Sequence, residues 1–137
     1  MDVLRNMVDA ARPGGVVLDL QVIRPNARVE VDGRFICEIG GEVLFGKAAA
    51  ATAAVDAAIA AGRLVEEAVD DHDVLKHYPS GADLLADLDR RGLSPVDEAA
   101  LPRLGAIGGP CVTRERCRLR RLRLPGPASR DPGSARR

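Results

Sequence analysis

The chain has 137 residues and a formal net charge of +0; 46% of its residues are hydrophobic but only 2% are aromatic, so we expect a single domain whose modest core is built from Ala, Val, Leu and Ile. No apolar run approaches the roughly 20 residues of a membrane-spanning helix and no basic and apolar leader opens the chain, which argues against secretion and membrane insertion. The three cysteines, Cys37, Cys111 and Cys117, follow no metal or disulfide spacing, which predicts free thiols in the reducing cytoplasm.

The N-terminal segment predicts an amphipathic helix that ends at a glycine turn. Asp2 can cap this helix, and Pro13 with Gly14-Gly15 ends it. Its apolar face, spaced at i, i+3, i+4 and i+7, consists of Leu4, Met7, Val8 and Ala11.

Val16 to Val22 predicts a strand in the middle of a sheet. One face is wholly apolar and the other is mixed: the first carries Val16, Leu18, Leu20 and Val22, and the second carries Val17, Asp19 and Gln21. We expect the apolar face to be packed firmly and the mixed face less fully. The carboxylate of Asp19 is either a functional group near a cleft, or a structural one that accepts hydrogen bonds from a neighbouring loop or lies at an open sheet face.

Two extended segments around Asp32-Gly33 predict an inserted β-meander. A bulged three-residue turn at Gly33 would oppose Glu30 to Arg34, which pairs opposite charges. A two-residue turn would oppose Val31 to Arg34 and is less consistent. We favour the bulged turn, after which Gly40-Gly41 returns the chain into an extended segment from Val43 to Phe45.

Two helices follow the meander. The first, from Lys47 to Ala61, is rich in alanine, buries Val55 and Ile59, and closes at Gly62. After an extended Leu64 to Val69, residues 70–79 predict an acidic loop. The second helix has an N-cap at Ser80, a reciprocal capping residue at Asp83 and a stop at Gly92, and its buried face consists of Leu84, Leu85 and Leu88. Pro95 to Leu104 is expected to be a polar connection with a helical turn.

The last element, from Cys111 onward, predicts an arginine-rich strand. Its leucines do not all fall on one face of a regular strand, so the strand either bulges near Arg120-Arg121 or is only partly a strand.

The charges of the chain are divided unevenly. From Cys111 to the end the chain carries nine Arg against Glu115 and Asp131, so the net charge of this segment is +7 and that of the remaining residues is −7. This split fits either a nucleic-acid-binding tail or a basic segment that lies on its own acidic body. We favour the second interpretation, because the segment has no aromatic residue that could stack on bases.

The order of these elements resembles the C-terminal half of class I S-adenosylmethionine-dependent methyltransferases. In that family a helix commonly ends in a Pro-Gly-Gly turn that leads into the fifth strand, as Arg12 to Val17 does here. The segment "HYPSGADLLADLDRRG" is similar to the tyrosine-containing loop and helix before the closing antiparallel strands, and "CRLRRLRL" to the last of these strands. The resemblance implies an α/β fold for residues 1–124, an incomplete Rossmann-like three-layer sheet with the inserted β-meander. Residues 125–137 are expected to form a disordered Pro/Gly/Arg-rich tail.

The resemblance implies S-adenosylmethionine as the cofactor, yet it places no cofactor-binding residue on this chain. Family members hold the cofactor at a glycine-rich turn after the first strand, which has no counterpart here. Gly40-Gly41 and the glycines of 105–109 lack the G-x-G pattern and a strand-to-helix context. We therefore expect a truncated methyltransferase-like protein that is inactive alone.

Three residues are the candidates for contact with an acceptor substrate: His72, His77 and Tyr78. Histidines beside carboxylates suit a metal site or a general base, but their spacing matches no zinc motif. Tyr78 could equally be a half-buried ring with a locally bonded hydroxyl. Cys117 lies between two arginines and could have a lowered pKa, or could be a small apolar residue on the inward face of a strand.

The main alternative to an enzyme is a non-enzymatic interaction module. A partial sheet exposes edges and an apolar face, which a homo-oligomer or a partner chain could cover. Nucleic-acid binding through the arginine-rich C-terminus is a third and weaker possibility.

Overall fold

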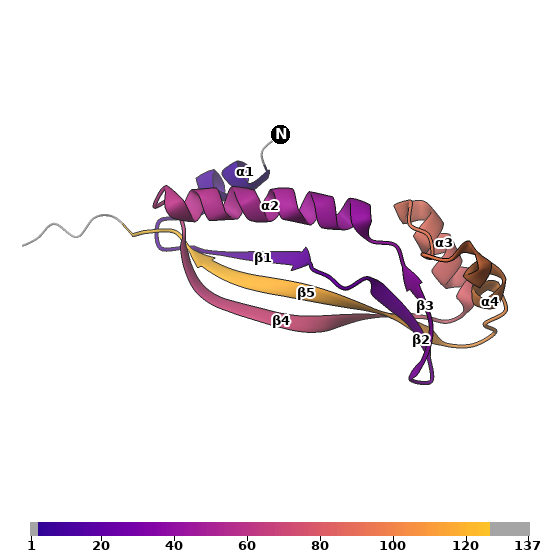
Figure 1. The fold of residues 1–137 in the computed structure, drawn as a ribbon. Helices are drawn as coiled ribbons and strands as arrows, with labels where there is room; N and C mark the ends of the chain where they lie inside the picture. Colours follow the sequence, from indigo (N-terminus) through magenta and orange to yellow (C-terminus); the bar gives the residue numbers. More distant parts are fainter. Residues whose placement is uncertain (1–2, 127–137) are drawn as a thin grey trace, which may run out of the picture. The chain divides into compact units, whose positions relative to one another are not determined.

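The computed structural model describes residues 3–126 as a mixed α/β fold with a five-stranded antiparallel sheet (Figure 1). The strands are β1 Val16–Val22, β2 Ala27–Val31, β3 Arg34–Ile39, β4 Val65–Tyr78 and β5 Cys111–Arg123. The helices in this range are α1 Val3–Ala10, α2 Glu42–Ala60, α3 Gly81–Arg91 and α4 Leu101–Gly105, with a 3-10 turn at Glu98–Ala100. The predictions for Asp2 and for residues 127–137 of the tail lie outside the described residues.

The strand order is β1-β5-β2-β3, and β4 also pairs with β5. Among the strands of residues 3–126, β5 is thus the common partner of three others, while β1 lies at the end of the order. The prediction that Val16 to Val22 lies in the middle of the sheet is therefore wrong for residues 3–126. The α/β class is confirmed, and the Rossmann-like layering is not.

The described chain divides into two compact units. Unit 1 comprises residues 3–21, 49–70 and 119–126, and unit 2 comprises 22–48 and 71–118. Each unit has its own apolar core. The core of unit 1 contains Val17, Val55, Leu64, Leu122 and Leu124, and that of unit 2 contains Val29, Cys37, Ile39, Tyr78, Leu84, Leu88, Ala100, Leu104 and Cys111.

In unit 1 the strand β1 buries the opposite face from the one expected. Val17 is only 5% exposed and packs with Val55 of α2 and Leu122 of β5. Leu18 and Leu20, on the wholly apolar face, are 58% and 52% exposed. The alternation is that of a strand, but the helices cover its mixed face.

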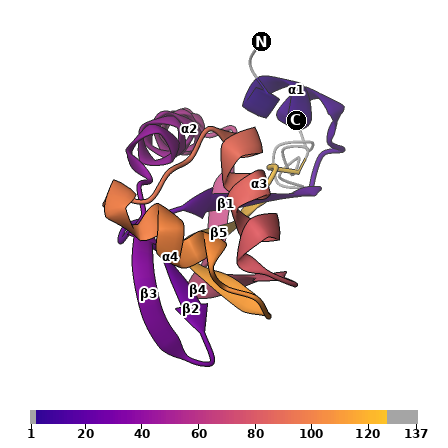
Figure 2. The same cartoon turned by 90° about the vertical axis from the view of Figure 1, so that its right-hand side faces the viewer.

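In unit 2 the strands β2 and β3 form a hairpin (Figure 2) with a two-residue turn. Asp32 and Gly33 have φ angles of 49° and 74°, the left-handed values that an Asp-Gly turn of this kind requires. Val31 is therefore opposite Arg34, and the register shifts between Val29 and Glu30. The bulged turn that we favoured is wrong, and the two-residue alternative is correct.

The helix α2 begins at Glu42, earlier than expected, so the predicted extended segment from Val43 to Phe45 is its first turn. Gly62, with a φ of 74°, follows its end as predicted. Within residues 3–126, α2 is one helix whose length and composition would allow a membrane span, contrary to our expectation. This is weak evidence for a membrane span, because the core helix of a soluble protein can have the same length and composition.

Residues 70–78 of the predicted acidic loop are instead extended and form more than half of β4, which ends at Tyr78. Its carboxylates face arginines of β5, which the local sequence does not reveal. Beyond β4, the prediction for α3 is confirmed. The Asp83 amide donates to Ser80 Oγ at 3.3 Å, and Gly92 ends the helix in the left-handed conformation, with a φ of 67°.

The predicted change of phase in β5 is present. Cys111, Thr113 and Cys117 are buried in the first part of the strand, whereas Arg120 and Leu122 are buried in the second part. The buried residues have odd numbers up to Cys117 and even numbers from Arg120 onward, so the change lies slightly before the expected position at Arg120-Arg121. All residues from Cys111 to Arg123 are nevertheless extended.

Two glycines provide a matched test of this packing. A Cβ on Gly81 would lie 1.8 Å from the Leu104 carbonyl oxygen, whereas a Cβ on Gly46, within α2, would meet no atom within 4 Å. We expect Gly81→Ala to lower the free energy of unfolding by about 1–3 kcal/mol and Gly46→Ala to raise it by about 0.5–1 kcal/mol. Urea denaturation of both variants is the measurement, and equal stabilities would contradict the close approach of α3 and α4.

Candidate functional site

The candidate site is a polar cluster centred on Asp87 of α3, within unit 2. Leu84 and Leu88, on the same helix face, are fully or almost fully buried and fix this face against the core. Asp87 lies between them and is only 7% exposed. A carboxylate buried to this extent requires hydrogen-bonding or charged partners.

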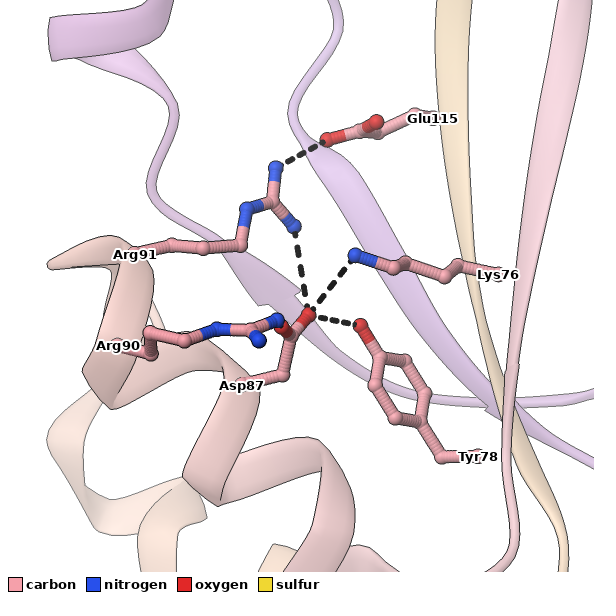
Figure 3. A network of polar contacts seen from close by, with 6 residues as sticks. All are labelled: Lys76, Tyr78, Asp87, Arg90, Arg91 and Glu115. Atoms are coloured by element: carbon pink, nitrogen blue, oxygen red, sulfur yellow. Dashed lines mark hydrogen bonds and ion pairs between the residues drawn. The ribbon is translucent and has the colours of Figure 1, made fainter.

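Three side chains donate to this carboxylate (Figure 3). Tyr78 Oη and Lys76 Nζ, both from β4, donate to Asp87 Oδ2 at 2.5 Å and 3.0 Å. Arg90, one turn further along α3, donates to Asp87 Oδ1. The two carboxylate oxygens are thus both satisfied, and the contacts fasten α3 to the end of β4.

Arg91 connects the cluster to β5. Its guanidinium lies 3.8 Å from Asp87 Oδ2 and 3.5 Å from Glu115 Oε1 (Figure 3). The six side chains of the cluster carry three positive charges, on Lys76, Arg90 and Arg91, and two negative charges, on Asp87 and Glu115. One positive charge is therefore in excess.

The cluster shifts two pKa values in opposite directions. The hydrogen bond from Tyr78, followed by that from Lys76, holds the pKa of Asp87 far below its usual range. Burial, followed by the hydrogen bond to Asp87, raises the pKa of Tyr78 to about 12. At neutral pH Asp87 is therefore ionised and Tyr78 keeps its proton.

These protonation states determine the chemistry available to the cluster. A phenol with a pKa of about 12 is a poor general base at neutral pH, and its proton is already donated to Asp87. The exposed part of the cluster borders an open depression lined by Lys76, Tyr78, Asp83, Ala86, Asp87 and Arg90. The arrangement can therefore bind and orient a polar or anionic group, rather than abstract a proton.

Of the three candidate residues, only Tyr78 belongs to this cluster. His77 precedes it on β4 and is exposed, and His72 lies half-buried six residues before Tyr78. Successive residues of a strand point to opposite faces, so His77 and Tyr78 point away from each other. A contact of any of them with substrate stays a prediction.

Four residues of the cluster were not predicted from the sequence: Asp87, Lys76, Arg90 and Arg91. The sequence does contain a signal that Asp87 is buried and paired. Asp87 lies on the same helix face as Leu84 and Leu88, and arginines follow it at i+3 and i+4. Lys76 could not be found in this way, because its contact with α3 depends on the path of β4.

A second polar feature is the pairing of the β5 arginines with carboxylates. In unit 2, Arg118 donates two hydrogen bonds to Asp71, at 2.8 Å and 2.9 Å, and Arg116 donates to Asp73 at 3.2 Å. Arg114 bonds both Glu30 and Asp73. These contacts confirm, for the described residues, that the basic segment lies on an acidic part of its own chain. They lower the pKa values of Glu30, Asp71 and Asp73, mainly through the hydrogen bonds from these arginines.

In unit 1, Arg120 is the most buried of the β5 arginines. Its guanidinium donates to Glu66 of β4 at 2.6 Å and to Asp56 of α2 at 2.9 Å. Arg123, further along β5, pairs with Glu67 of β4 in an exposed contact. Arg120 therefore links the helix to the sheet, whereas Arg123 links only the two strands.

The Gly40-Gly41 turn does not fit S-adenosylmethionine. Gly40-Gly41 does connect a strand, β3, to a helix, α2, so our statement that this context was lacking is wrong. Its amides are, however, already bonded to the Ser94 carbonyl and to Asn26 Oδ1, and the first helical residue is the acidic Glu42. The cavity beside the turn measures about 20 Å³, enough for about one water molecule.

The three cysteines are all buried, and the described acidic residues form no metal-binding group. Cys37, Cys111 and Cys117 are buried free thiols, and burial is the main cause that raises the pKa of each. The suggestion that Cys117 has a lowered pKa is therefore wrong, and its placement on the inward face of β5 is correct. Among residues 3–126, no group of three His, Cys, Asp or Glu could hold a metal ion.

No family model, curated protein or solved structure matches this chain.

Tyr78 is the one tyrosine of the chain, so ultraviolet absorbance reports its ionisation directly. We expect a midpoint near pH 12 in the folded protein and near the ordinary value of about 10 in urea. Since the folded pKa is the higher one, the associated stability is complete below about pH 10 and is lost as the pH rises toward 12.

The variant Asp87→Asn is the control for this titration. It should lower the midpoint of Tyr78 only part of the way toward 10, because burial is the larger cause of the shift. A folded-state midpoint near 10 in the unsubstituted protein would contradict the buried Tyr78–Asp87 contact.

Arg120 and Arg121 provide a matched pair on β5. The side chain of Arg120 is 10% exposed, and that of Arg121 is 49% exposed and 3.9 Å from Glu67. We expect Arg120→Ala to lower the free energy of unfolding by about 1.5–3 kcal/mol, because it removes hydrogen bonds between charged groups. Arg121→Ala should cost less than about 1 kcal/mol. Urea midpoints would measure both, and a larger effect for Arg121 would contradict the assigned faces of β5.

Proposed function

We propose that this chain forms the C-terminal, acceptor-side part of an S-adenosylmethionine-dependent methyltransferase-like protein. The observation that carries the proposal is the position of β5, which pairs with both β1 and β4. The last strand of the chain therefore closes the sheet beside the strand that follows the Pro-Gly-Gly turn, in keeping with the closing antiparallel strands of that family. Under this proposal β1, β4 and β5 belong to a Rossmann-like sheet.

The local elements also support the proposal. Gly14, with a φ of 77°, lies in the turn between α1 and β1, and the amide of Gly14 donates to the carbonyl of Leu124, the residue after β5, at 3.1 Å. The capped helix α3 follows a tyrosine, Tyr78, at the end of β4. These are the segments on which the resemblance rests.

The Asp87 cluster would act on the acceptor side. Lys76 and Arg90 line the depression beside Tyr78, together with the carboxylates of Asp83 and Asp87. The two cations would bind a carboxylate, phosphate or carbonyl oxygen of the acceptor directly. These residues would bind and orient such a group. S-adenosylmethionine would supply the methyl group, and its binding residues would come from another polypeptide segment.

The test is photochemical cross-linking with tritiated S-adenosylmethionine. A tagged chain is isolated together with its partners from the cells that make it, and in parallel from a heterologous host. We expect label in the first preparation, competed by excess S-adenosylhomocysteine, and none in the second. A native assembly without competed label would contradict the proposal, and micromolar cofactor binding by the chain alone would contradict the absence of a cofactor site.

The second candidate function is a partner-binding module without catalysis. It is favoured by one observation, the exposure of Leu18 and Leu20 on a strand at the end of the sheet order. For the described part of β5, the pairing of its arginines with carboxylates argues against nucleic-acid binding by this strand, because these arginines are already paired within the chain.

A further inference from the structure

The strand β1 has one unpaired edge within the described part of the chain. Of the strands in residues 3–126, only β5 pairs with it. The Ile23 amide, just after β1, donates to the Arg116 carbonyl at 2.9 Å. Alternation along an antiparallel strand then directs the amides of Asp19 and Gln21 toward β5 and those of Leu18 and Leu20 toward the free edge.

This edge lacks the features that normally protect an edge strand. Proteins block such edges with charged residues, proline or bulges. The sequence of β1 is VVLDLQV, with one charged residue and no proline, and Leu18 and Leu20 are more than half exposed. The outer strand β4, by comparison, carries charged residues such as Glu67 and Asp71 that pair with arginines of β5.

A groove lies along β1 on the side of the helices, within unit 1. It has a volume of about 380 Å³, and its lining includes Met7 of α1, Ala51 and Val55 of α2, and Asp19 of β1. Asp19 Oδ1 accepts a hydrogen bond from Gln21 at 2.8 Å. Asp19 Oδ2 is buried and has no hydrogen-bond partner among the described residues. A buried carboxylate oxygen without a donor is costly.

We propose that the free edge of β1 is a docking site for an added β-strand from another polypeptide segment. The strand would pair with the backbone of Leu18 and Leu20 and place alternate side chains in the groove and beside the exposed leucines. It would therefore be apolar on both faces. One inward residue would be a cation or another hydrogen-bond donor, because it meets Asp19 Oδ2.

This chemistry distinguishes the proposed strand from a second copy of β1. An antiparallel copy centred on Asp19 would bring two like-charged carboxylates together, which is unfavourable. The docking site does not depend on methyl transfer, so its test and the cofactor test can fail separately.

The test uses two synthetic valine- and isoleucine-rich peptides of the same length as β1, solubilised by a terminal polyethylene glycol chain. They differ only in the central residue, which is lysine in one and glutamate in the other. With the full chain, we expect the lysine peptide to bind at least about tenfold more tightly. It should also slow hydrogen exchange at the amides of Leu18 and Leu20, but leave that of Asp19 little changed.

Two variants make the result specific. Asp19→Asn should bring the affinities of the two peptides within about twofold of each other. Leu20→Pro removes an edge-facing amide without removing a hydrogen bond to β5, and should abolish binding while the chain stays folded. Equal affinities for the unsubstituted chain, or no protection at Leu18 and Leu20, would overturn the proposal. A dimer in sedimentation that Leu18→Lys dissociates would also overturn it, because a second copy would then occupy the edge.

Discussion

The structure depends on the pairing of β5 with β4, and the charges on these strands match in register. Each described arginine of β5 from Arg114 to Arg123 lies within 4.0 Å of a carboxylate, and most of these carboxylates belong to β4. Individual exposed ion pairs contribute little to stability. Their value here is in selecting the register, since a shift by one residue would reverse the faces of the side chains. The described arginines of β5, from Arg114 to Arg123, thus form an intramolecular interface with carboxylates of β4.

The Asp87 cluster uses the same kind of contact for a different purpose. Its carboxylate is buried, so the loss of one donor would leave an incompletely satisfied charge in the core. Tyr78 reduces this cost with a neutral hydroxyl, and Lys76 and Arg90 provide the compensating charge at the surface. The cluster therefore fixes α3 on β4 and also presents cations to the solvent. The structural role does not exclude the binding role, because Arg90 and Lys76 are both accessible.

Those features that depend on neighbouring residues could be predicted from the sequence. The cap at Ser80, the stop at Gly92 and the strand from Val16 to Val22 are correct because each depends on local conformational preferences. Features that depend on distant partners could not be predicted. Periodicity shows which residues of β1 share a face, but the position of α1 and α2 decides which face is buried. The acidic segment 70–79 was assigned to a loop because the arginines that neutralise it are more than 40 residues away in the sequence.

The contrast between the two outer strands bears on both candidate functions. The charged residues of β4 oppose pairing with an apolar strand. Within residues 3–126, β1 instead offers apolar side chains, an open backbone edge and a carboxylate oxygen without a donor. A chain that functions alone would gain stability and solubility from a lysine or a proline on β1. The apolar sequence of β1 instead favours a sheet that continues beyond this strand. A methyltransferase-like assembly and a catalytically inactive binding module would both meet that requirement, so the added strand is the more general inference, and the cofactor decides between the two functions.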